Sequence, residues 1–182
     1  FHLLLLLSPT SVLDARVLSS LDVHAGGFTA QFGDRMSAVI EATSLRHDAD
    51  AYYELGLSLF HANALASHRF AAGKGQWLVA ARRSNLDEIA DLVDSEIGEP
   101  SYSDAFGRLD YDFTEHTRGS LHVLLAEDRA EVQDSDEHET AKATYRNSYV
   151  WGTLEHDFSE ATTARAILSF TDVESHREGE VN

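Results

Sequence analysis

Apolar and polar residues alternate with a period of two through most of the sequence after about residue 50. Between positions 104 and 113, the odd positions are apolar, aromatic or glycine, whereas the even positions are mostly charged. The pattern recurs at positions 121–125, 150–154 and 164–170. Because successive side chains of a strand point to opposite faces, this alternation predicts β-strands with one apolar face and one charged face.

Breaks in the alternation divide this region into about seven antiparallel strands joined by links of two kinds. Early strands are expected at about 52–60, 63–70 and 76–83. A tight turn is expected near His61 and Ala62, because one long strand would place His61 and Asn63 on the apolar face. The expected short links are residues 71–75, 114–117 and 159–162, and the long acidic links are 84–101 and 129–139.

A mainly β fold with these two faces favours part of a transmembrane β-barrel, with lipid outside and a wet lumen inside. A tilted strand needs roughly ten residues to cross a membrane, which matches the expected strands. Short turns at one end and long loops at the other are typical of outer-membrane barrels, so strand 104–113 is expected to run towards the periplasm. The alternative is a soluble β-rich binding domain that buries its apolar face. A small closed barrel fits poorly, since bacterial barrels have even numbers of strands.

Composition excludes several classes of protein. The 14 Lys and Arg against 31 Asp and Glu give a formal charge of −17, which would repel nucleic acid. The absence of cysteine excludes a disulfide framework and a thiolate metal site. The apolar run at residues 3–7 is too short for a signal peptide or a membrane helix, so a buried strand or helix segment is expected there. The chain starts with Phe1, which leads us to expect a processed or excised piece.

Residues 20–43 carry a more specific pattern. Gly26, Gly27 and Phe28 are followed after a short spacer by Phe32 and Gly33, then by Arg35 and an expected strand at 37–43. This segment resembles the end of the plug domain in TonB-dependent outer-membrane receptors. Ala38, where many members have glycine, and Glu41, in a strand that is usually more neutral, depart from the family pattern. Residues 77–83, the acidic link and residues 102–113 also look like the family's early barrel.

The resemblance implies that residues 1–48 are the C-terminal part of a plug domain and residues 49–182 the N-terminal portion of a barrel of about twenty-two strands. Such receptors take up scarce ligands, such as siderophores, vitamins or oligosaccharides, across the bacterial outer membrane. Their partners are the small-molecule ligand, outer-membrane lipid and lipopolysaccharide, and the protein TonB, which contacts a box that would precede Phe1. No enzymatic activity and no cofactor are expected.

The resemblance also suggests where plug and barrel attach. In the family, plug arginines can pair with acidic residues on the inner wall, so Arg35 is expected to help seat the plug. The candidate partners on the charged face are Asp110, Asp112, Glu155 and Asp157. The alternative for Arg35 is a surface arginine that contributes little to stability.

Other chemistry has weaker support. The ten histidines show no ligand spacing, and residues 73–75 are no phosphate loop. Residues 134–137 resemble part of a calcium loop but lack its glycine and closing glutamate, so a solvated loop or weak divalent binding is expected. The acidic loops could also bind cations that bridge lipopolysaccharide, or attract a cationic ligand. Positions 85–93 fit either a short amphipathic helix capped by Asn85 or an irregular loop.

Overall fold

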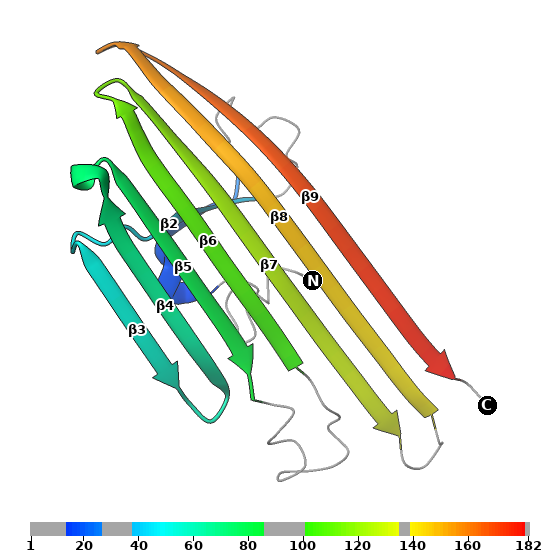
Figure 1. Cartoon of the computed structure of the whole chain (residues 1–182). Helices are drawn as coiled ribbons and strands as arrows, with labels where there is room; N and C mark the ends of the chain where they lie inside the picture. The colour runs from blue at the N-terminus through cyan, green and yellow to red at the C-terminus, as the bar shows by residue number, and fades with distance from the viewer. Residues whose placement is uncertain (1–13, 27–37, 86–100, 135–138, 181–182) are drawn as a thin grey trace.

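A computed structural model describes residues 14–26, 38–85, 101–134 and 139–180 of the 182-residue chain. Within these residues the chain is mainly β, as predicted. Seven antiparallel strands form one sheet in the order β3 to β9, each paired with its neighbour in sequence, and β1 and β2 form a separate hairpin (Figure 1). The strands are β1 (Leu18–His24), β2 (Val39–Ser44), β3 (Ala51–Leu57), β4 (His61–Phe70), β5 (Gly75–Ser84), β6 (Ser101–Thr114), β7 (Thr117–Asp134), β8 (Glu139–Ser159) and β9 (Thr162–Glu180).

The predicted short turns are present at one end of the sheet (Figure 1). Two residues, Glu115 and His116, connect β6 to β7, and Glu160 and Ala161 connect β8 to β9. The 3-10 turn η2 (Ala71–Gly73) connects β4 to β5. Gly73 has a φ of 88° there, a left-handed conformation that glycine adopts without steric cost.

The turn between β3 and β4 lies at residues 58–60 rather than at the predicted His61 and Ala62. The hydroxyl of Ser58 accepts hydrogen bonds from the amides of Phe60 (3.2 Å) and His61 (3.1 Å), which closes the turn early. His61 therefore begins β4, and its parity places it with Asn63 on the charged face. The prediction that these two polar residues avoid the apolar face is correct, although the predicted turn position was wrong.

The last three strands are much longer than the expected ten or so residues. β7 has 18 residues, β8 has 21 and β9 has 19. The predicted long link at 129–139 is wrong, because β7 and β8 stay paired as far as Asp134 and Glu139. The backbone hydrogen bonds between β7 and β8 continue beyond the part of the strands in which apolar residues occupy one face. The helix or loop predicted at 85–93 lies, after Asn85, outside the described residues, as do residues 86–100 of the long link predicted at 84–101.

An N-terminal segment, defined here as residues 14–26 and 38–48, covers the charged face of β4 to β6. It comprises the short 3-10 helix η1 (Ala15–Val17) and the β1–β2 hairpin, which lie behind the sheet in Figure 1. Val17 of η1 is fully buried. It packs in a small core with the sheet residues Leu65, Leu78, Ala80 and Phe106.

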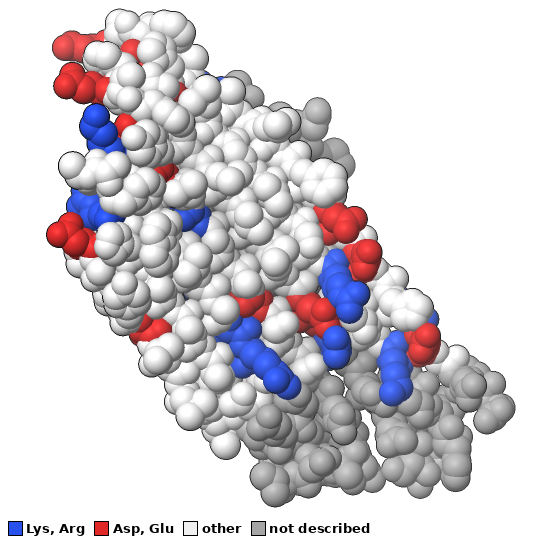
Figure 2. All heavy atoms as spheres, in the orientation of Figure 1, with Lys and Arg blue, Asp and Glu red and all other residues white. Residues whose placement is uncertain are grey.

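The opposite, apolar face of the sheet is exposed in the described structure. Leu55 is 87% exposed, Leu57 84% and Leu168 82%. Figure 2 views this face, where charged side chains gather towards the strand ends and leave an uncharged area across the middle. Among the described residues, no helix is both long and apolar enough to span a membrane.

Candidate functional site

The charged face carries a row of four residues with alternating charge across β6 to β9. Antiparallel register places Asp112 opposite Arg118, Arg118 opposite Glu155, and Glu155 opposite Arg165. Glu155 accepts hydrogen bonds from Nε of Arg118 (2.7 Å) and Nε of Arg165 (2.6 Å). The side chain of Glu155 is 10% exposed, whereas the side chains of Arg118 and Arg165 are 57% and 59% exposed. One buried carboxylate therefore holds two arginines whose outer N–H groups face solvent.

A second cluster on the same face attaches the N-terminal segment. Arg108 of β6 is 4% exposed, and its Nε lies 2.5 Å from Oδ2 of Asp110. Its Nη1 donates to the carbonyl oxygens of Ser44 (3.2 Å) and Leu45 (3.0 Å). Arg46 reaches the other oxygen of Asp110, at 3.1 Å. Asp110 and Arg108 thus fix the chain where it leaves β2.

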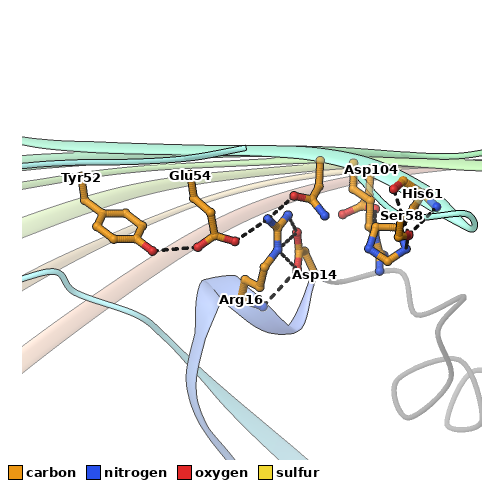
Figure 3. Close-up of polar contacts among 9 residues, drawn as sticks. Asp14, Arg16, Tyr52, Glu54, Ser58, His61 and Asp104 are labelled. Atoms are coloured by element: carbon orange, nitrogen blue, oxygen red, sulfur yellow. Dashed lines mark hydrogen bonds and ion pairs between the residues drawn. The ribbon is translucent and has the colours of Figure 1, made fainter. Parts of the chain in front are cut away.

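A third cluster surrounds η1 (Figure 3). Asp14 caps η1 by accepting a hydrogen bond from the amide of Arg16 at 3.0 Å. The guanidinium of Arg16 donates to Asp14, to Asn63 and, at 2.9 Å, to Glu54. The hydroxyl of Tyr52 donates to the other oxygen of Glu54 at 2.7 Å. Arg16 consequently bridges the N-terminal segment to β3 and β4.

These contacts set the ionisation of Asp14 and Arg16. Burial alone would raise the pKa of the Asp14 carboxyl, but hydrogen bonds from Arg16 outweigh burial and hold the pKa below its usual value of 3.8. The hydrogen bond to Asp14 in turn raises the pKa of Arg16. Both groups are therefore charged at neutral pH and form a true ion pair.

A groove of about 420 Å³ lies between Arg46 and the alternating row. Its polar lining consists of Arg46, Asp110, Asp112, Arg118, Ser120, Thr153, Glu155 and Arg165. Donors and acceptors of both charges face this space, so it suits a polar solute with several hydrogen-bonding groups. Among the described residues, no group of three or more His, Asp or Glu side chains is placed to hold a metal ion.

The four predicted acidic partners all lie on the charged face near the short turns. Asp110 and Glu155 have arginine partners, and Asp112 lines the groove. Asp157 lies 3.9 Å from Arg118 and accepts a hydrogen bond from Thr163. Of the predicted plug-end motif, Gly26 is described, and a Cβ added there would meet nothing within 4 Å. The other members, Gly27, Phe28, Phe32, Gly33 and Arg35, lie outside the described residues.

The arginines that bind these acids were not predicted. Arg108 and Arg165 were recognisable from the sequence, because their parity places them on the same face as the acids. Arg46 carried no such signal, since its contact with Asp110 joins residues far apart in sequence.

Comparison with known proteins finds no matching family model, no matching curated protein and no matching solved structure.

Proposed function

We propose that this chain forms wall strands and a lumen-side segment of a TonB-dependent outer-membrane receptor. The whole protein would take up a scarce ligand of the siderophore, vitamin or oligosaccharide class. The observation that carries the proposal is that the apolar face of the sheet is exposed, whereas the charged face is partly covered. A soluble sheet packs its apolar face on a core, whereas a barrel wall turns that face to lipid.

An aromatic cluster at the short-turn end of the apolar face supports a membrane boundary there. Phe70 stacks on Tyr111 with ring centroids 6.1 Å apart, and Tyr111 meets Phe113 edge-on at 5.2 Å. The rings cover two glycines, Gly75 and Gly119, which flank Tyr111 in the register. Aromatic girdles at the lipid–water boundary are typical of outer-membrane barrels.

The height of the apolar area is also appropriate for a membrane. It runs from the Gly119 level to the first charged residue on the same face of β7, Glu127. That stretch rises about 27 Å at ~3.4 Å per residue. A strand tilt of about 40° reduces it to roughly 20 Å, comparable with the ~25 Å apolar band of such barrels.

The edges of the sheet favour continuation into a larger barrel. β3 and β9 each pair with one neighbour in the described sheet. Unpaired backbone groups at an edge are costly in lipid, so spanning sheets close. We therefore propose that residues 49–182 contribute strands to a closed barrel and that residues 1–48 belong to the plug inside it.

The way the N-terminal segment is attached fits a plug that must yield during transport. Most of its described contacts with the sheet are hydrogen bonds and ion pairs through Arg16, Arg46 and Arg108, and Val17 is the buried apolar side chain it contributes to the core. Polar groups released from such an interface are solvated by water, so opening costs less than exposing a large apolar core.

Membrane placement is tested on the full-length protein that contains this sequence. It is expected in the outer-membrane fraction, to stay there after urea washing, and to migrate faster on a gel before boiling than after it. Recovery as a stable protein in detergent-free buffer would instead support the soluble β-rich binding domain.

Transport is tested by uptake of radiolabelled ferric siderophore, cobalamin and maltooligosaccharide into cells with and without the gene. Uptake of one of these probes is expected to fall when either this gene or the TonB gene is deleted. Unchanged uptake of all three in the gene deletion would overturn the proposed substrate classes.

A further inference from the structure

One row of side chains on the charged face is covered by the end of the N-terminal segment. The register places Ser67 of β4, Leu78 of β5, Arg108 of β6 and His122 of β7 in line across four strands. Residues 44–47 are held over this row by hydrogen bonds from the sheet. Ser67 is fully buried, Leu78 is 1% exposed and Arg108 is 4% exposed. The row is therefore largely closed to solvent.

Three polar atoms of this row are buried without a hydrogen-bond partner among the described residues. They are Oγ of Ser67, Nη2 of Arg108 and Nδ1 of His122. Buried polar groups in folded proteins are nearly always paired, so three unpaired atoms in one row need a physical explanation. A ligand that accepts hydrogen bonds beneath residues 44–47 provides one for Arg108 and His122.

The unpaired nitrogens of Arg108 and His122 can both act as donors to one acceptor. The two residues are directly opposite each other, which places their Cβ atoms about 4.5–5.5 Å apart. The Nη2 group of a guanidinium only donates. Nε2 of His122 lies 3.2 Å from Oγ of Ser120, and when this hydroxyl donates to Nε2 the ring proton is on Nδ1. Two donors cannot pair with each other, but one acceptor between them pairs with both.

The charges around Arg108 indicate that this acceptor is an anion. Nε of Arg108 lies 2.5 Å from Oδ2 of Asp110, and Oδ1 of the same carboxylate lies 3.1 Å from Nη2 of Arg46. Two arginines therefore share one carboxylate, and the three groups together carry one positive charge. The next acid along β6, Asp112, is opposite an arginine of its own, Arg118. A buried charge is stable only when it is compensated, and an anion supplies the missing charge.

The space available restricts the anion to a small one. The groove of about 420 Å³ reaches Asp110 and Arg46, but its lining does not include Arg108 or His122. An ion therefore enters from this groove past Arg46, whose side chain is 61% exposed and free to move. A halide is a single atom, whereas a sulfate or an organic acid would have to displace residues 44–47.

We propose that a chloride ion binds between Nη2 of Arg108 and Nδ1 of His122 and holds the N-terminal segment on the sheet. Arg108 also donates to the carbonyl oxygens of Ser44 and Leu45, so fixing its guanidinium fixes the segment. A ligand that binds only the docked arrangement stabilises that arrangement. The inference goes beyond the proposed function, because it concerns the covered face and holds for a barrel wall and a soluble sheet alike.

Chloride binding is tested by chlorine NMR line broadening on the full-length protein in detergent, with bromide as competitor. His122→Phe keeps a ring that can stack on Trp151 but removes Nδ1, and it should weaken chloride binding about tenfold. The control is Arg177→Gln, which removes an exposed arginine on β9 and should leave chloride affinity unchanged. Equal affinity in His122→Phe and the unmodified protein would overturn the proposal.

A second substitution at the same position separates the donor from the ring. The side-chain amide of His122→Asn can donate from nearly the position of Nδ1, but it cannot stack on Trp151. We expect this variant to bind chloride more tightly than His122→Phe. If the two variants bind equally weakly, the ring and not the donor is what matters, and the assigned chloride contact is wrong.

The effect on docking is measured by protease cleavage of the N-terminal segment in sodium chloride and in sodium gluconate at equal ionic strength. Charge screening is the same in both salts, and gluconate is too large for the site. At free chloride about ten times its Kd, cleavage should be about tenfold slower than in gluconate. This difference should shrink strongly in His122→Phe. Equal cleavage of the unmodified protein in the two salts would show that chloride does not hold the segment.

The heat-dependent gel shift of the same samples distinguishes failure of this proposal from failure of the proposed function. A preserved shift without chloride binding overturns the chloride site alone. Chloride binding without a shift supports the chloride site and counts against the membrane barrel.

Discussion

Arg108 is almost fully buried, and its guanidinium bonds both to its own strand, through Asp110, and to the N-terminal segment, through Ser44 and Leu45. A buried charge persists only when it is paired and hydrogen-bonded. Because Ser44 and Leu45 lie more than 60 positions from Arg108 in the sequence, Arg108 determines where the N-terminal segment lies on the sheet.

Arg108→Ala is therefore expected to loosen the N-terminal segment. It removes three contacts to that segment and leaves Asp110 buried with Arg46 as its remaining arginine partner. Breaking such a pair costs about 3–5 kcal/mol, so protease cleavage within the segment should accelerate by about 100-fold or more. Arg177→Ala, which removes an exposed arginine stacked on Tyr145, is the control and should leave cleavage unchanged. Equal cleavage in both variants would contradict the attachment.

The lowered pKa of Asp14 predicts how docking of the segment around η1 depends on pH. Its pKa in the folded protein lies below 3.8, so its ion pair contributes stability above the unfolded-state pKa, and this is lost as pH falls through the lowered folded-state pKa. The segment around η1 should stay docked at neutral and mildly acidic pH and loosen only below about pH 4. Pepsin cleavage near η1, followed across the acidic range, measures this loosening.

Asp14→Asn separates this effect from general acid unfolding. The amide cannot pair ionically with Arg16, so docking should already be weaker at neutral pH and its acid dependence should flatten. An unchanged pH profile in this variant would show that another group controls the docking.

At the scale of elements, the strands and their faces could be predicted because period-two alternation is visible in consecutive residues. The ends of the strands could not be predicted from this pattern. The β3–β4 turn depends on hydrogen bonds to the Ser58 hydroxyl, and the extension of β7 and β8 depends on a backbone ladder that ignores side-chain polarity. The candidate site divides in the same way. Its acids follow from parity, whereas Arg16 bonds to Asn63 from 47 residues away.

The two faces of β7 can be tested directly, because the chain has no cysteine that would interfere with labelling. Spin labels on single cysteines at Leu121 and Val123 should collide readily with lipid-dissolved oxygen, and a label at His122 should not. The reason is that Leu121 is 47% exposed on the apolar face, whereas His122 stacks on Trp151 on the covered face. Equal oxygen accessibility at all three positions would contradict the assigned faces.

Two glycines on the apolar face offer a matched stability test. A Cβ at Gly75 would collide with the ring of Phe70, but a Cβ at Gly107 would meet nothing within 4 Å. Gly75→Ala should displace the ring and destabilise the sheet by about 1–3 kcal/mol, and Gly107→Ala should be close to neutral. Urea unfolding of the full-length protein in detergent measures both. A similar loss in the two variants would mean that the ring does not pack over Gly75.

At the scale of the whole molecule, the charged clusters on the two faces have different surroundings. The cluster around Glu155 lines a groove beside the N-terminal segment, whereas the cluster of Glu127 with Arg129 and Arg146 on the opposite face borders exposed apolar surface. The same arrangement of two arginines and one glutamate therefore occurs on both faces, beside a polar groove on one and beside exposed apolar surface on the other. The sheet itself keeps these two environments apart.

The edges of the sheet give the last prediction. β3 has 7 residues and β9 has 19, which correspond to about 23 Å and 63 Å of strand at ~3.3 Å per residue. A second copy that paired its β3 with β9 would leave most of β9 uncovered, so copies of this chain cannot close a barrel by head-to-tail pairing. The isolated 182-residue chain in detergent should form heterogeneous assemblies by light scattering and show no heat-dependent gel shift. In the proposed barrel further strands would cover both edges, so the full-length protein should give a single species that shifts. A uniform, shifting oligomer of the isolated chain would show that its edges pair with one another and that no further strands are needed.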